Sequence, residues 1–267
     1  MNKPLTITFL LTMLVLISNA QKLPNIQTLS VRTPQQLIID GNPKEWDNNL
    51  QAHNHATEIS YTIANDDNNL YLVAQATDQD VINKILRGGL TLAIQKTGKK
   101  DDKNTVAITY PISDIAFSFR LRVLKEGKPD TTTEVNNALM GKNNKLLEQH
   151  IKSIGIKGIG GIDSLISIYN ENDIKAAGLF DFNKVYTLEL CLPLKYLQLS
   201  VAVESKFSYH IILNGYKRAP TIGAPIKMDG TPVTGPKVES MMAFVAQWDA
   251  AVSARTDFWG EYTLAKK

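Results

Sequence analysis

Cysteine is almost absent from this chain of 267 residues, because Cys191 is the only one, and an internal disulfide is therefore excluded. Leu190 and Leu192 flank Cys191, so we expect a small buried side chain there rather than a reactive nucleophile. An excess of charge of one sign is also lacking, since 29 Lys and Arg residues stand against 26 Asp and Glu residues, with no dense basic block. The electrostatic footprint of a nucleic-acid-binding protein is missing, and we predict no nucleic-acid partner.

Sequence motifs of common enzyme classes are missing as well. The chain has no G-x-S-x-G elbow, no H-E-x-x-H segment and no pair of cysteines at metal-binding spacing. The glycine-rich run 155–161 lacks the Lys-Ser/Thr ending of a phosphate-binding loop, and we interpret it as a turn into a strand at 165–169. Nothing in the spacing of Glu45 and Glu189 pairs these carboxylates. We therefore expect a protein without catalytic activity.

Residues 1–20 have the anatomy of a secretory signal peptide. Lys3 supplies a positive start, residues 5–17 form an apolar run, and small residues at 18–20 precede Gln21. The apolar run is shorter than the roughly 20 residues that span a bilayer, and Gln21 stands where a lipid-anchored protein carries cysteine. We predict a signal peptide at 1–20, a single domain at 21–267 without a transmembrane helix, and a secreted, periplasmic or cell-surface location.

Alternation of apolar residues with period two dominates the remaining chain and is typical of strands that bury one face. It predicts a hairpin at 58–76 and extended segments at 36–40, 90–94, 105–110, 116–124, 186–194, 207–214 and 256–264. Helical signals are few: a short helix or turn at 80–87, and an insertion at 132–151 that Gly141 and Asn143-Asn144 should divide. The Pro- and Gly-rich stretch 216–240 is expected to be a long surface loop.

These patterns together predict an all-β fold, an antiparallel jelly-roll-type β-sandwich with a small helical insertion. The alternation also predicts which side chains lie inside. We expect six side chains from the first turn and from three of the strands to be buried. They are Trp46, Tyr71, Leu188, Leu190, Tyr209 and Ile211.

Three short motifs carry a resemblance to a known family. Residues 40–46 read Asp-Gly-Asn-Pro-Lys-Glu-Trp, residues 66–71 read Asp-Asp-Asn-Asn-Leu-Tyr, and Glu189 precedes Pro193 in the pattern E-x-x-x-P. In this order, and with Asp78 after the second motif, they resemble family 9 carbohydrate-binding modules and the related DOMON-like β-sandwiches. The closing segment 256–264 is similar to the end of exported relatives of Bacteroidota type. The resemblance implies a non-catalytic carbohydrate-binding-like module whose ligand is a glycan.

Acidic and amide side chains gather in the predicted turns. Calcium takes oxygen ligands from such groups, and family 9 modules hold calcium structurally, so the resemblance implies a structural calcium ion. The candidate ligands in this chain are Asp40, Asp66, Asp67 and Asp78. The alternative is that Asp and Asn stand there because they tolerate turn geometry.

Aromatic rings decide where a sugar could stack, because flat rings pack on the apolar faces of sugars. Trp46 matches the structural tryptophan of the first motif and is expected to be buried. Trp248 and Trp259 lie after the long loop, and these two are the candidate ligand-binding residues.

Two other functions stay open at this point. The chain is alternatively a surface or periplasmic protein-interaction module without a sugar site, with a surface protein as partner. A DOMON-like haem-binding redox domain is the other alternative, and it needs an axial pair from the available residues Met140, Met228, Met241, Met242, His150 and His210.

A histidine pair adds one more candidate metal site. His53 and His55 place two imidazoles on one face of an extended segment, as a zinc site does, although the sequence names no third ligand. Solvated histidines in a polar segment are the alternative interpretation.

Overall fold

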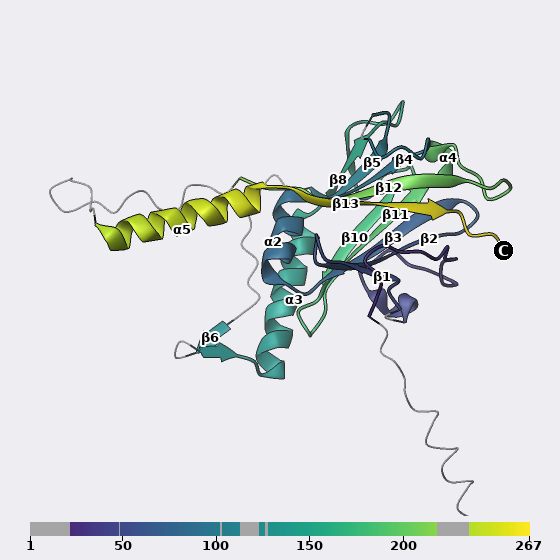
Figure 1. Cartoon of the computed structure of the whole chain (residues 1–267). Coiled ribbons are helices and arrows are strands. Elements are labelled where there is room, and N and C mark those ends of the chain that lie inside the picture. The colour runs from purple at the N-terminus through teal and green to yellow at the C-terminus, as the bar shows by residue number, and fades with distance from the viewer. Residues whose placement is uncertain (1–21, 48, 102, 113–122, 126–127, 218–234) are drawn as a thin grey trace, which may run out of the picture.

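The computed structural model describes residues 22–47, 49–101, 103–112, 123–125, 128–217 and 235–267. The predicted signal peptide and most of the strand expected at 116–124 lie outside these residues. Two antiparallel sheets pack face to face (Figure 1). In spatial order the five-stranded sheet contains β1 (Ala52–Asn54), β2 (Ile59–Asn65), β3 (Asn69–Ala76), β11 (Tyr186–Pro193) and β10 (Lys175–Phe180). The six-stranded sheet contains β13 (Thr256–Thr263), β12 (Lys206–Leu213), β4 (Leu90–Gln95), β5 (Val106–Ile112), β8 (Ser153–Lys157) and β9 (Leu165–Ser167).

Five helical segments and a small hairpin accompany the sheets within the described residues. They are η2 (Pro43–Trp46), α2 (Gln79–Gly88), α3 (Thr133–His150), α4 (Leu194–Leu197), α5 (Pro236–Ser253) and the pair β6 (Val123–Lys125) and β7 (Lys128–Asp130). Helices α2 and α3 lie at one end of the sandwich, and α5 extends away from that end (Figure 1). The predicted all-β sandwich with a helical insertion is confirmed. Within the described residues, no helix combines the length and apolar character needed to cross a bilayer.

The core forms between the inner faces of the two sheets. Along β3, Leu70, Leu72 and Ala74 point into this core, as alternation requires. The hydroxyl groups of Tyr61 on β2 and Tyr209 on β12 lie 2.8 Å apart and join the two sheets. All six residues predicted to be buried are buried, each with at most 8% exposure.

A second apolar cluster covers the outer face of the five-stranded sheet. It consists of Trp46, Leu50, Ala64, Tyr71, Val73 and Cys191, with Val31, Leu37 and Ile39 packed against it. The predicted strand at 36–40 is wrong, because these residues cross the sheet without joining its hydrogen-bond ladder. Gln36 adopts φ +60°, a left-handed conformation that ends an extended strand. The segment from Val31 to Trp46 therefore acts as a strap over the sheet.

Three other local predictions need correction. Helix α3 runs unbroken through Gly141, with Leu139, Met140, Asn143 and Leu147 buried along one side. Residues 155–157 of the predicted glycine-rich turn belong to β8. Residues 236–240 of the predicted loop form the start of α5, where Pro236 stands at the first turn.

Candidate functional site

A pocket lies on the outer face of the five-stranded sheet, beside the strap. Its floor follows from strand register: Tyr71 on β3 pairs with Cys191 on β11, which pairs with Lys175 on β10. Side chains at alternate positions share a face, so the neighbouring pair Asn69 and Pro193 extends the same floor. The consecutive strands β10 and β11 thus form one surface with β3, which lies far from them in the sequence.

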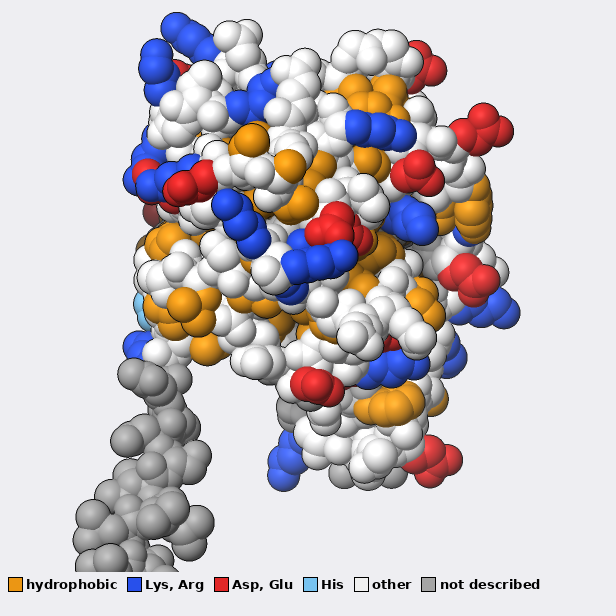
Figure 2. Space-filling view, turned by 90° about the vertical axis from the view of Figure 1, so that its right-hand side faces the viewer, with side chains coloured by type: hydrophobic (Ala, Val, Ile, Leu, Met, Phe, Trp, Pro, Cys, Tyr) orange, Lys and Arg blue, Asp and Glu red, His pale blue; other side chains and the backbone are white. Residues whose placement is uncertain are grey.

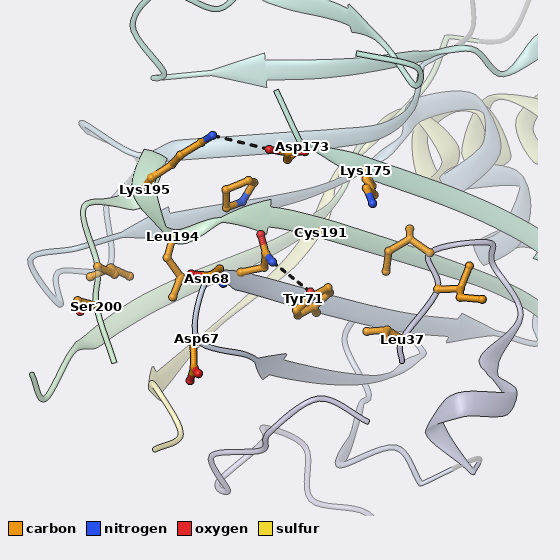
Figure 3. Close-up of a pocket in the computed structure, with 15 residues that line it drawn as sticks. Leu37, Asp67, Asn68, Tyr71, Asp173, Lys175, Cys191, Leu194, Lys195 and Ser200 are labelled. Carbon is orange, nitrogen blue, oxygen red and sulfur yellow. Dashed lines mark hydrogen bonds and ion pairs between the residues drawn. The ribbon is translucent and has the colours of Figure 1, made fainter. Parts of the chain in front are cut away.

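The pocket has a volume of about 770 Å³, within the range of roughly 300–1,000 Å³ common for ligand sites. The strap forms one wall and α4 with the residues after it forms the other (Figure 3). Apolar side chains contribute at both walls, and these are Leu37, Ile38, Ile39, Leu194 and Leu199. Ile38 is 59% exposed and lines the pocket as an accessible apolar surface.

Charged groups of both signs line the pocket. Asp67 at the β2–β3 turn is bound at 2.8 Å by both Arg32 and Lys267, which lower its pKa. Lys195 Nζ lies 3.8 Å from a carboxylate oxygen of Asp173 (Figure 3). The end of the sandwich seen in Figure 2 likewise carries basic and acidic side chains interspersed with apolar ones. The pocket therefore offers hydrogen-bond donors and acceptors next to apolar area.

Tyr71 is held rigidly in this floor by the turn before it. Its hydroxyl donates to Asp66 Oδ2 at 2.7 Å, while the backbone N–H groups of Asn68 and Asn69 donate to Asp66 Oδ1. Burial acts to raise the pKa of Asp66, but the hydrogen bonds from Tyr71, Asn68 and Asn69 outweigh it and lower that pKa. Burial raises the pKa of the Cys191 thiol to about 12, so the thiol stays protonated, as its expected role as a small buried side chain requires.

The first and third sequence motifs meet at a buried carboxylate next to the pocket. Trp46 Nε1 donates to Glu189 Oε1 at 2.8 Å, and the N–H groups of Gly41 and Asp40 donate to Glu189 Oε2 at 2.8 and 3.1 Å. Gly41 has φ +81°, and a Cβ atom there would collide with the backbone of Gly178 on β10. This set of contacts fixes the strap on the sheet and thereby builds one wall of the pocket.

The four aspartates proposed as calcium ligands lie in three turns, with Asp66 and Asp67 together in the β2–β3 turn, and each has partners of its own. Asp40 Oδ1 accepts from the N–H of Asn42, and Asp78 caps α2 by accepting from the N–H groups of Asp80 and Val81. Asp66 accepts from the Tyr71 hydroxyl and its own turn, and Asp67 faces two cations as described above. Among the described residues, these carboxylates form no group of three whose oxygens lie within 4.8 Å of one another, and their contacts fit the turn-forming alternative.

Trp248 and Trp259 lie in two different small pockets. Trp248 on α5 lines an apolar one of about 190 Å³ with Val81, Leu213 and Val252. Trp259 on β13 lines another of about 470 Å³ and stacks on His210, with ring centroids 4.1 Å apart. The structure does not bring the two tryptophans together, and neither lines the larger pocket.

The candidate haem ligands are scattered among the described residues. Met140 is buried in the core on α3, whereas His210 faces outward from β12 beside Trp259. His150 ends α3, Met241 is 38% exposed on α5, and Met228 lies outside the described residues. The pockets described above are lined by neither methionine nor histidine.

Sequence reasoning named only part of the larger pocket, where Asp67 is a candidate calcium ligand and Asn68 and Asn69 belong to a quoted motif. Tyr71 belongs to the same motif, whereas Lys175, Lys195 and Asp173 belong to no recognisable sequence motif. The pairing of β10 with β11 and of β11 with β3 places Lys175 in the same row as Cys191 and Tyr71. In comparisons with known proteins, no family model, no curated protein and no solved structure matches this chain.

Proposed function

We propose that this protein is an exported, non-catalytic glycan-binding module that takes its ligand in the pocket on the outer face of the five-stranded sheet. The observation that carries the proposal is the lining of that pocket. The accessible apolar side chain of Ile38 lines it together with the hydrogen-bonding side chains of Lys175, Asn68 and Asp173.

A sugar ring matches such a lining for a physical reason. Each ring has apolar C–H patches framed by hydroxyl groups, and hydroxyls both donate and accept hydrogen bonds. Ile38 and Leu37 offer apolar contact, carboxylates and amide oxygens accept, and lysine ammonium groups donate. A purely apolar ligand would leave these polar groups unpaired, at a cost in binding energy.

The resemblance to family 9 carbohydrate-binding modules supports the same proposal. The first and third of the motifs that carry it are joined by the hydrogen bonds from Asp40, Gly41 and Trp46 to Glu189. The predicted signal peptide agrees with a ligand met outside the cytoplasm.

A glycan array containing neutral and uronate-bearing oligosaccharides tests the proposal, followed by titration calorimetry with the best binder. Lys175→Ala and Ile38→Ser should each weaken binding by about tenfold, since each removes one contact worth about 1.4 kcal/mol. Both positions are exposed, so the melting temperature should stay unchanged.

Lys206→Ala is the matched control, because Lys206 is also an exposed lysine but lines the pocket of Trp259. It should leave the affinity unchanged. If Trp259→Ala or Trp248→Ala abolishes binding while the Lys175 and Ile38 variants bind normally, the sugar site lies at those tryptophans instead. Absence of any binder on the array would contradict the glycan proposal.

A further inference from the structure

The β1–β2 hairpin brings together three side chains that are good metal ligands. Strand β1 is the outermost strand of the five-stranded sheet, and it pairs His53 with Ser60 and Asn54 with Ile59 across the hairpin. His55 and Glu58 lie in the connecting turn. The sequence pointed to His53 and His55 but to no third ligand, and the fold supplies Glu58.

The connecting turn is held in one shape by a buried asparagine. Asn54 is 1% exposed, and its Oδ1 accepts from the N–H groups of Ala56 and Thr57 and from the Thr57 hydroxyl. The N–H of His55 donates to the side-chain oxygen of Asn25, which ties the turn to the N-terminal segment. A preorganised turn lowers the entropic cost of collecting ligands around an ion.

Distances within this group match metal coordination. His53 Nε2 lies 3.4 Å from Glu58 Oε2, and ligand atoms of all three residues lie within 4.8 Å of one another. Two ligands at about 2.0–2.1 Å from a tetrahedral zinc ion are separated by about 3.4 Å. The His53–Glu58 pair therefore already has the required spacing, and a ring nitrogen of His55 lies within 4.8 Å of both.

His53 also has the partner that orients a metal-binding imidazole. Its Nδ1 lies 2.9 Å from Ser60 Oγ, which leaves Nε2 directed at Glu58. Metal-binding histidines commonly use the other ring nitrogen in this way, and the partner fixes the orientation of the ring. Ser60 is placed by strand register, so the arrangement is part of the hairpin and not of a loose surface.

We propose that the β1–β2 hairpin binds one late divalent transition-metal ion, of the class of Zn²⁺, through His53, His55 and the carboxylate of Glu58. Imidazole nitrogen with carboxylate oxygen is a donor set for zinc and its neighbours in the series rather than for calcium or magnesium. Both His55 and Glu58 are exposed, so an ion can enter from solvent and complete its coordination with water.

Titration calorimetry of the untagged protein with ZnCl₂ tests the proposal, with the absorption spectrum of added Co²⁺ as a second readout. One equivalent should bind, and His55→Gln and Glu58→Gln should each weaken binding by at least about tenfold. Ser60→Ala should weaken it less, through the orientation of His53.

His150→Gln is the control, because His150 is an exposed histidine on α3, outside the hairpin. It should bind Zn²⁺ like the unaltered protein. His55 and Glu58 are exposed, so circular dichroism should show every variant folded. Failure of the unaltered protein to bind one equivalent, or equal affinity in the His55 and Glu58 variants, would overturn the proposal.

Discussion

At the scale of single residues, the buried carboxylate of Glu189 should make the stability of the fold depend on pH. Burial raises its pKa above the ordinary value of 4.5, and the hydrogen bonds from Trp46, Gly41 and Asp40 offset only part of that rise. A carboxyl with a raised pKa holds its proton longer in the folded state than in the unfolded chain. Its contribution to stability is therefore fully present below the unfolded pKa and is lost as pH rises through the folded one.

Glu189→Gln should remove this pH dependence, because the amide resembles the protonated acid in shape and does not titrate. We expect the stability of the unaltered protein, relative to this variant, to decrease as pH rises above about 4.5. Urea unfolding of both proteins at a series of pH values measures this difference in unfolding free energy. A difference between the two proteins that increases with pH over this range would show that the hydrogen bonds to the carboxylate dominate over its burial.

At the scale of elements, helix α3 contains Gly141 at a position where neither the backbone conformation nor the surrounding space requires glycine. Gly141 is exposed in the middle of the helix, and a Cβ atom there would meet no described atom within 4 Å. Gly141→Ala should therefore raise the unfolding free energy by about 0.5–1 kcal/mol, since glycine loses more backbone entropy in a helix.

Gly178→Ala provides the contrast, because its Cβ would overlap the Tyr186 hydroxyl across β10 and β11. That variant should be destabilised in the same urea assay. Equal effects of the two substitutions on the unfolding free energy would mean that the space around each Cβ atom does not govern them.

Alternation in the sequence predicts the elements whose faces are buried to different degrees. It finds β13, whose inner residues are buried and whose outer residues are more exposed. It also finds β3, although Tyr71 and Val73 on the outer face of that strand are covered by the second apolar cluster. It fails for residues 36–40 of the strap, where Leu37 and Ile39 pack on the sheet and Ile38 stays exposed, as in an edge strand, although none of them joins the hydrogen-bond ladder. It also gives no warning of α5, although Pro236 at the first turn and the following run of good helix formers are a usable signal.

The candidate site is harder to predict than the strands around it, for a physical reason. Its floor depends on the register of β3, β11 and β10, and a shift of one residue would turn Tyr71 and Lys175 to the other face. The histidine pair is visible in the sequence because its members are two residues apart. Glu58 becomes its companion only when the hairpin closes.

At the scale of the whole molecule, an ion that binds only the folded state raises the melting temperature of the protein. Such an ion adds stability of RT ln(1 + [L]/Kd), about 2.7 kcal/mol at a hundredfold excess over Kd. Structural calcium at the four aspartates predicts a melting temperature that rises in CaCl₂ and falls in EGTA. The partners of Asp66, Asp67 and Asp78 lead us to expect no such change.

Zn²⁺ provides the internal comparison in the same melting experiment. It should raise the melting temperature through the β1–β2 hairpin, and this rise should disappear in Glu58→Gln while calcium has no effect on either protein. Asp66→Asn should lower the melting temperature equally in CaCl₂ and in EGTA, because it weakens the turn that holds Tyr71 and removes no ion. A rise in CaCl₂ that Asp66→Asn abolishes would instead assign that carboxylate to a calcium ion, with its turn contacts as the surrounding shell.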